Sequence, residues 1–208
     1  MIPSGTGIQK RTADERREAI VGIARDMFLS GGYGATSMSS IAGKVGGSKT
    51  TLWTYFPSKQ ELFAAVADDL VERFGRALEV RLDPNEDIKG ELCRFAQALL
   101  TTLHSDPIVE MHRLVIGEAG RFPELGAMMY ERGPAKGKAR LAAFFEACIA
   151  RGKVRNGDGR QAAEHFAAML QAGSAQRRLL GLAGRPSDEQ LSEEAAGAVQ
   201  TFMHGWHP

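Results

Sequence analysis

Apolar residues recur along most of the chain at the three- and four-residue spacing that places them on one face of a helix. Alternation of apolar and polar residues, the pattern of a half-buried strand, is absent from the sequence. The pattern therefore predicts an all-α protein of about nine helices, separated by glycine, proline and short polar turns. The expected helices are 12–31, 38–45, 48–55, 58–81, 86–104, 107–120, 123–151, 159–182 and 187–204.

Residues near the ends of these segments support the assignment. In a capping box, a Ser or Thr side chain accepts a hydrogen bond from the backbone three residues on, where a Glu or Gln side chain bonds back. Pro134 predicts a kink or break after Gly133, because its nitrogen cannot donate to the carbonyl of Tyr130. The pairs with capping-box spacing are Thr12 with Glu15, Ser58 with Glu61, and Ser187 with Gln190.

Two short helices, 38–45 and 48–55, are expected next to each other near the N-terminus. Helices of about two turns are not stable alone and must pack on their neighbours. Joined by the turn at Gly46 and Gly47, they have the arrangement of a helix-turn-helix, in which the second helix reads DNA. Leu52 is expected to face the core. The side chains left for the DNA groove are Lys49, Thr50, Thr51, Trp53 and Thr54.

Charge is distributed unevenly along the chain. Residues 1–60 contain eight Lys or Arg and four Asp or Glu, a formal charge of +4, whereas the rest contains 18 and 21, a charge of −3. A basic N-terminal part followed by an acidic remainder is typical of a DNA-binding domain joined to a domain that does not touch DNA. Chance alone also produces such a difference. Lys10 and Arg11 either contact DNA, in the minor groove or at phosphates, or form a loose charged tail.

Two segments resemble the DNA-binding region of the TetR family of transcriptional regulators. The first is Gly32-Tyr33-Gly34-Ala35-Thr36-Ser37-Met38-Ser39-Ser40-Ile41-Ala42, and the second is Ser48-Lys49-Thr50-Thr51-Leu52-Trp53-Thr54-Tyr55-Phe56-Pro57-Ser58-Lys59-Gln60-Glu61-Leu62. The resemblance covers about residues 12–63. It departs from the family pattern at three positions. The family usually has an apolar residue at the position of Gly47, Gly or Ala at that of Thr50, and Tyr at that of Trp53.

The resemblance implies roles for individual residues. Positions matching Thr36, Ser48 and Tyr55 often support or touch phosphates in that family. The residue matching Lys59 commonly lies at a helix N-terminus against the DNA backbone, and positions matching Thr50, Thr51 and Trp53 lie near bases. The full set of expected DNA-binding residues is Lys10, Arg11, Thr36, Ser37, Ser48, Lys49, Thr50, Thr51, Trp53, Thr54, Tyr55 and Lys59.

The later part of the chain also resembles TetR proteins. Segments 113–125, 130–134 and 178–181 are similar to the C-terminal domain of a subgroup that includes multidrug-efflux regulators. The expected organisation is therefore a flexible basic arm at 1–11, a helix-turn-helix DNA-binding domain at 12–58, and a helical ligand-binding and dimerisation domain at 59–208.

Methionine and aromatic residues gather in this later part. Methionine is adaptable and suits pockets for apolar molecules, but the same residues also serve as ordinary core. The candidates for a ligand pocket are Met111, Val115, Phe122, Met128, Met129, Phe144, Phe145, His165 and Met169.

The last two expected helices, 159–182 and 187–204, each carry an apolar face. These faces either pack on a second copy as a four-helix bundle or complete the core of a single chain. The family resemblance favours a homodimer, because helix-turn-helix proteins that read palindromes are two-fold symmetric. The residues expected at the dimer interface are Ala163, Ala167, Gly173, Leu191, Ala195, Val199 and Phe202.

Other classes of protein find no support in the sequence. Cys93 and Cys148 lie in no metal or disulfide pattern, the five histidines have no metal spacing, and no phosphate-binding, dinucleotide-binding or nucleophile motif is present. We expect no cofactor, no catalytic site, no membrane segment or signal peptide, and a cytoplasmic location.

The favoured function is a repressor that a small apolar or amphipathic ligand releases from palindromic double-stranded DNA. The alternative is a TetR-like DNA-binding protein without an inducer pocket, such as a chromosome-organising protein. An all-helical enzyme is a third class, and no catalytic group of residues supports it.

Overall fold

The computed structural model of the chain describes residues 12–46 and 49–206. Every regular element in these residues is a helix, which confirms the expected all-α fold. The chain divides into two compact units, Met1–Val66 and Ala67–Pro208. The division falls eight residues later than the expected boundary at 58, because α4 (Lys59–Phe74) begins in the first unit and ends in the second. No helix among the described residues is long and apolar enough to cross a bilayer.

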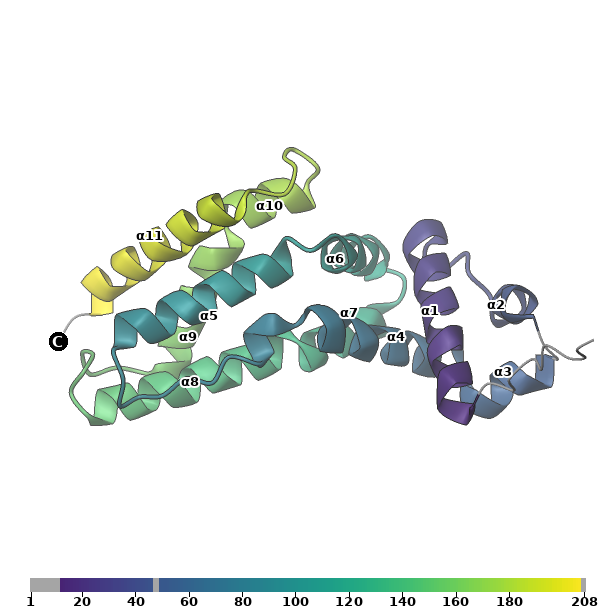
Figure 1. Ribbon diagram of the computed structural model, residues 1–208, viewed down its shortest axis with the longest axis horizontal. Helices are drawn as coiled ribbons and strands as arrows, with labels where there is room; N and C mark the ends of the chain where they lie inside the picture. The colour runs from purple at the N-terminus through teal and green to yellow at the C-terminus, as the bar shows by residue number, and fades with distance from the viewer. Residues whose placement is uncertain (1–11, 47–48, 207–208) are drawn as a thin grey trace, which may run out of the picture. The chain divides into compact units, whose positions relative to one another are not determined.

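The first unit consists of α1 (Ala13–Gly31), α2 (Met38–Val45), α3 (Lys49–Tyr55) and the start of α4 (Figure 1). The capping box at its first helix is confirmed, since Glu15 N donates to Thr12 Oγ1 at 3.2 Å and Thr12 N donates to Glu15 Oε2 at 2.8 Å. α1 ends where Gly32 adopts a positive φ of 82°.

Three aromatic rings form the centre of the first unit. Phe28, Tyr33 and Phe63 lie with ring centroids 5.2 to 5.6 Å apart, and all three are buried. The pairs of Phe63 with Phe28 and with Tyr33 are edge-to-face, an arrangement that adds to the free energy gained by burying the rings. Apolar residues from each helix complete this core; they are Ile20, Val21, Ala24, Ile41, Ala42, Leu52, Phe56 and Leu62.

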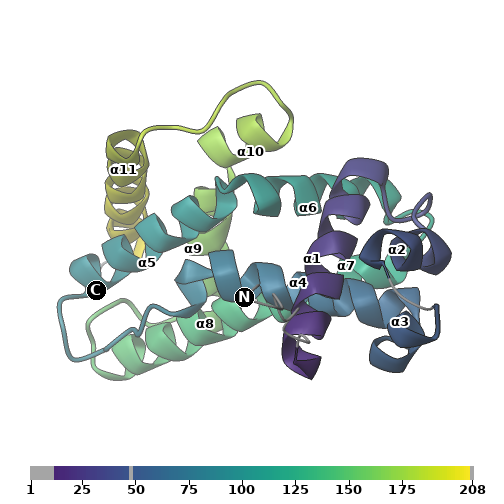
Figure 2. The same cartoon turned by 45° about the vertical axis from the view of Figure 1, so that its right-hand side comes forward.

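The second unit holds the rest of the chain. Its elements are the end of α4, a short 3-10 helix η1 (Arg76–Leu78), α5 (Ile88–Leu103), α6 (Asp106–Glu118), α7 (Pro123–Arg132), α8 (Pro134–Ala150), α9 (Gly159–Gln171), α10 (Gly173–Leu179) and α11 (Asp188–Trp206). α8 packs against α9, and α11 packs against α5 (Figure 2).

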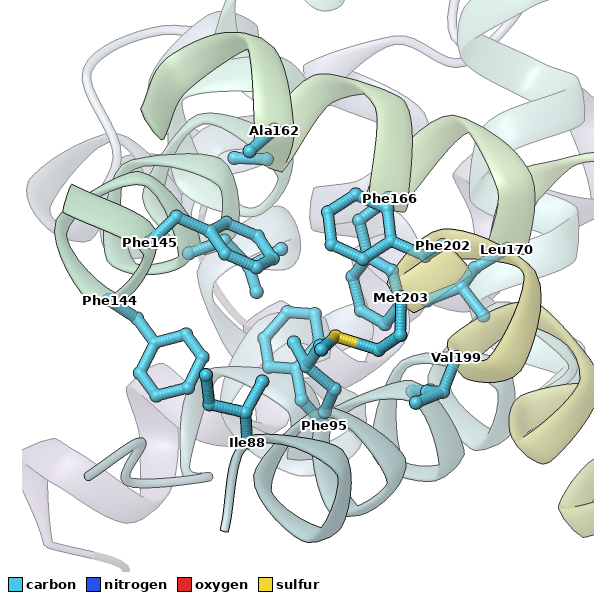
Figure 3. Close-up of a cluster of buried hydrophobic side chains, with 14 of the residues drawn as sticks. Ile88, Phe95, Phe144, Phe145, Ala162, Phe166, Leu170, Val199, Phe202 and Met203 are labelled. Carbon is cyan, nitrogen blue, oxygen red and sulfur yellow. The ribbon is translucent and has the colours of Figure 1, made fainter. Parts of the chain in front are cut away.

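A cluster of phenylalanines joins four of these helices. Phe95 of α5, Phe145 of α8, Phe166 of α9 and Phe202 of α11 are all buried, and their side chains gather in one cluster (Figure 3). The ring of Phe202 lies 5.1 Å from the rings of both Phe145 and Phe166. Burial of such large side chains is the main source of stability available to an all-helical unit.

The helix boundaries agree with the sequence at one interruption and differ at two. The expected break at Gly133 is present, since α7 ends at Arg132 and α8 starts at Pro134. The expected helix 58–81 instead ends at Phe74. Gly75 follows, and a Cβ there would lie 2.4 Å from the carbonyl oxygen of Val71.

The expected helix 159–182 is also wrong as a single helix, because it divides into α9 and α10. Gly173, with φ of 62°, turns the chain so that Ser174 N donates to Glu194 Oε1 at 3.3 Å, while the Ser174 hydroxyl donates to Glu194 Oε2. The same hydroxyl lies 2.9 Å from Nε2 of buried His104, whose pKa is lowered by burial. A buried polar network thus fixes this break, and the described residues form more helices than the nine expected.

Candidate nucleic-acid interface

The two helices of the expected helix-turn-helix are both present. Ser37 caps α2, accepting from Ser40 N at 3.0 Å, and Gly46 ends it in the left-handed region at φ 70°. α3 follows. Gly47 and Ser48 lie outside the described residues, as do Lys10 and Arg11 of the expected basic arm.

α3 has one buried side and one outward side. Leu52 is 1% exposed, as expected for its core position, whereas Trp53 is 38% exposed and Thr54 is exposed. Thr51 and Tyr55 are half-buried. Lys49 and Thr50 form the first turn of α3. The outward side of the helix therefore exposes an indole ring and a hydroxyl.

Thr36 serves the fold of the first unit itself. Its side chain is buried, and Thr36 Oγ1 lies 2.8 Å from Gly32 O and 3.2 Å from Met27 O. The hydroxyl therefore ties the loop before α2 to the end of α1. Ser37, one residue later, is exposed and caps the N-terminus of α2, the positive end of the helix dipole.

Lys59, expected at the DNA backbone, makes contacts within the first unit. Its Nζ donates to Tyr33 O at 2.9 Å and to Thr36 O at 3.1 Å, and it lies 4.2 Å from the centroid of the Tyr33 ring. A cation at the first residue of a helix is disfavoured by the helix dipole, and these carbonyls offset that cost. Lys59 thus fastens the loop before α2 to the start of α4.

This geometry gives a testable prediction for Lys59. Lys59→Met keeps the length of the side chain and removes its charge. We expect a loss of about 2 kcal/mol in the stability of the first unit, because two charge-assisted hydrogen bonds and a cation–π contact disappear. Hydrogen-exchange mass spectrometry of peptides covering residues 33–45, across a urea series, measures this loss.

Lys44→Met on the exposed surface of α2 is the matched control and should change little. The opposite result would be an unchanged stability for Lys59→Met, together with a smaller salt dependence of DNA binding. The slope of log affinity against log salt concentration would then be about one unit less steep. That outcome would make Lys59 a phosphate contact, as the family resemblance implies.

The second unit contains an apolar cavity of about 130 Å³. It is lined mainly by aliphatic, aromatic and methionine side chains, with a few polar groups among them. Its lining includes Leu70 and Val71 of α4, Phe95 of α5, Met111 and His112 of α6, and Met129 and Arg132 of α7.

The cavity includes two of the nine expected ligand residues, Met111 and Met129. Phe144 and Phe145 are buried in the phenylalanine core, Met169 packs against it, and His165 is exposed with its ring 6.4 Å from that of Trp206. Val115 is buried, and Phe122 and Met128 are half-buried, outside the lining. His112 and Arg132 could not be predicted as lining residues, because a lone polar residue on a helix does not reveal which cavity it borders.

Six of the seven residues expected at a dimer interface are buried within the single chain. Ala163, Ala167, Leu191, Ala195, Val199 and Phe202 are each at most 4% exposed, and Gly173 alone is exposed. Side chains already packed in the core cannot also form an outer face. The sequence pattern therefore identified the inner faces of α9 and α11. The outer face of α11 instead carries Glu193, Ala196, Gly197, Gln200 and Thr201.

Two families of known proteins match this chain. Residues 20–66 match the model of bacterial regulatory proteins of the tetR family, and residues 90–208 match that of the AefR-like transcriptional repressor C-terminal domain. The chain belongs to the TetR family. TetR regulators bind operator DNA and usually form dimers, and the HTH-type regulators that match this chain control transcription.

Solved TetR structures resemble this chain over nearly its whole length. The flavonoid-responsive regulator FrrA is 32% identical, with a TM-score of 0.82 over 94% of this chain and 99% of its own. A TetR-family regulator from Mesorhizobium loti is 27% identical, with a TM-score of 0.79 over 96% of this chain and 100% of its own. The activator FasR of Mycolicibacterium smegmatis is 35% identical over 86 residues, so the chain spans only 39% of that curated relative's length.

Proposed function

We propose that this TetR protein is a homodimeric repressor that leaves a palindromic operator when a small apolar or amphipathic molecule binds its second unit. The observation that carries the proposal is the pairing of two features in one chain. The first unit has the exposed Trp53 and Thr54 of α3, and the second unit has an apolar cavity. A DNA-binding surface and a ligand-sized cavity on separate units are what a ligand-controlled regulator needs.

Support for DNA binding comes from the chemistry of α3 and from the family. The exposed indole of Trp53 suits apolar contact with thymine methyl groups, and the Thr54 hydroxyl suits base edges or phosphates. Lys49 and Thr50 at the start of α3, with Ser48, Thr51 and Tyr55, are proposed as further contacts. Such a regulator works where the chromosome lies, so the proposal places the chain in the bacterial cytoplasm.

Support for ligand control comes from α4. The helix begins at Lys59, beside the loop before α2, and its later residues Leu70 and Val71 line the cavity. A ligand that prefers one position of these two side chains acts on the same helix that the first unit uses. Binding of such a ligand shifts the protein between two states only by its difference in affinity for them. FrrA, described as flavonoid-responsive, is a relative for which a small molecule is named.

The direction of control is proposed from the match to the AefR-like repressor domain, which spans residues 90–208. FasR, described as an activator, matches a shorter part of the chain. Repression also follows from the proposed DNA binding, because a protein bound at a promoter blocks RNA polymerase without any further contact.

Replacing Trp53 tests the DNA-binding proposal. With an operator selected from a random DNA pool, we expect Trp53→Ala to lower the ratio of operator to scrambled-DNA affinity about tenfold, or about 1.4 kcal/mol, because a base contact is lost. Fluorescence anisotropy at fixed salt concentration measures both affinities.

Tyr130→Ala, which removes an exposed aromatic side chain from the second unit, is the control and should leave the ratio unchanged. An unaltered ratio for Trp53→Ala would remove α3 from base recognition.

A further inference from the structure

The polar groups that line the cavity differ in whether they already have partners. The Thr102 hydroxyl is bonded within the unit, lying 2.9 Å from Phe74 O and 3.0 Å from Ala98 O. Arg132 forms an ion pair with Asp68, with Nε 2.8 Å from Oδ1, and its Nη1 donates to Met128 O at 3.3 Å. Asp68 therefore balances the charge of Arg132, although Arg132 Nε makes no hydrogen bond within the described residues.

His112 is different because only one of its two ring nitrogens has a hydrogen-bond partner among the described residues. Nδ1 lies 2.8 Å from Ile108 O, and a carbonyl oxygen only accepts, so Nδ1 carries the proton. Burial lowers the pKa of His112, so the ring is neutral at neutral pH and Nε2 is an acceptor. Within residues 12–46 and 49–206, Nε2 has no hydrogen-bond partner, and the ring borders the cavity.

The size of the cavity limits what can satisfy this acceptor. An apolar cavity of about 150 Å³ holds one benzene ring, and this cavity measures about 130 Å³. The remaining polar lining residues, Lys138 and Gln171, are half-buried and exposed. Leu70, Phe95, Met111 and Met129 supply apolar walls for a flat ring.

We propose that the cavity takes a neutral, single-ring phenol whose hydroxyl donates a hydrogen bond to His112 Nε2. This inference rests on the proposed function, because it names the ligand class of the cavity through which that function is controlled. The apolar walls hold the ring, and the hydroxyl gives Nε2 a hydrogen-bond donor that the described residues do not supply. His112 is therefore the residue that selects a phenol over a hydrocarbon of the same shape.

The test uses two probes of nearly equal shape, p-cresol and p-xylene, which differ by a hydroxyl in place of a methyl group. Calorimetry on the full chain gives the affinity of each probe for the wild-type protein and for His112→Phe. We expect both probes to bind the wild-type protein. The preference for p-cresol over p-xylene should fall about tenfold in His112→Phe, while p-xylene binds at least as tightly as before.

A second measurement needs no variant. In ¹⁵N-histidine spectra of the wild-type protein, p-cresol should shift the Nε2 resonance of His112, whereas p-xylene should not. Benzoate should bind more weakly than p-cresol, because Arg132 is already paired with Asp68.

The outcomes separate the inference from the proposed function. An equal preference in both proteins, with no Nε2 shift, would overturn the role of His112. If p-xylene nevertheless bound and weakened operator binding, ligand control through the cavity would stand. Failure of every probe to bind would overturn the phenol assignment. Probes that bind and leave operator affinity unchanged would contradict the proposed function while supporting the cavity as a phenol site.

Discussion

Phe202→Ala is expected to destabilise the second unit by about 4 kcal/mol and to lower its melting temperature by about 10 °C. The centroid of the Phe202 ring lies 5.1 Å from those of both Phe145 and Phe166, and the ring stacks on Trp206 at 5.7 Å. Removing it deletes a large buried surface and leaves a hole in the middle of the phenylalanine core, which rigid helices cannot close.

Differential scanning calorimetry of the full chain measures this change, and Phe122→Ala is the matched control. Phe122 is a half-buried phenylalanine outside the core, so its replacement should cost much less. If Phe202→Ala melted like the wild-type protein but lost its dimer, then Phe202 would lie at a subunit interface, as the sequence pattern first suggested.

Phe202 also shows what an apolar stripe on a helix can and cannot reveal. The spacing of Leu191, Ala195, Val199 and Phe202 predicts that this face of α11 is covered. It does not say whether the cover is α5 of the same chain or a helix of another copy. α11 packs against α5, so the covered face belongs to the single chain. Helical periodicity indicates which face of a helix is buried. It does not identify the element that buries it, because that element is distant in the sequence.

Features encoded by neighbouring residues were predictable. The capping box at Thr12 and the break at Gly133 depend on residues within four positions of one another, and both are present. The break at Gly173 was missed because its cause is distant in sequence: Ser174 bonds to Glu194 and His104, 20 and 70 residues away. Likewise, the spacing around Lys59 could not reveal its bonds to the carbonyls of Tyr33 and Thr36.

The candidate cavity was the least predictable part. Methionine content pointed to Met111 and Met129, and both line it. The same reasoning also selected Phe144 and Phe145, which pack in the core. The sequence pattern around a methionine or phenylalanine is the same whether the side chain packs in a core or lines a pocket. His112 becomes a candidate only once Ile108 O is seen to hold Nδ1.

The buried inner face of α11 leaves its outer face as the surface for the proposed dimer, and Gly197 offers a direct test. Gly197 is exposed, and a Cβ placed there meets nothing within 4 Å. Gly197→Glu should therefore leave the single chain intact, or slightly more stable, because glutamate favours a helix over glycine by about 0.5–1 kcal/mol. In a two-fold interface each copy would bring its glutamate to the same contact, and burying both charges is costly.

We expect Gly197→Glu to be monomeric by sedimentation velocity and to bind a palindromic operator about 100-fold or more weakly. In a dimer, binding of one DNA-binding unit to its half-site makes binding of the second unit effectively intramolecular, which raises the affinity. A monomer loses this increase in affinity. Gly117→Glu on α6 is the matched control, because Gly117 is also exposed with nothing within 4 Å of a Cβ. It adds the same charge to the same unit and should remain dimeric with normal DNA binding.

The comparison between these two variants separates loss of the dimer from every other cause of weak binding. Both lower the net charge by one, so a general electrostatic effect on DNA affinity cancels between them. Both replace a helical glycine, so the stability of the chain rises or holds in both. A Gly197→Glu protein that sediments as the wild-type dimer would move the interface off this part of α11, and one that is monomeric yet binds the operator at full strength would remove the need for a dimer at all.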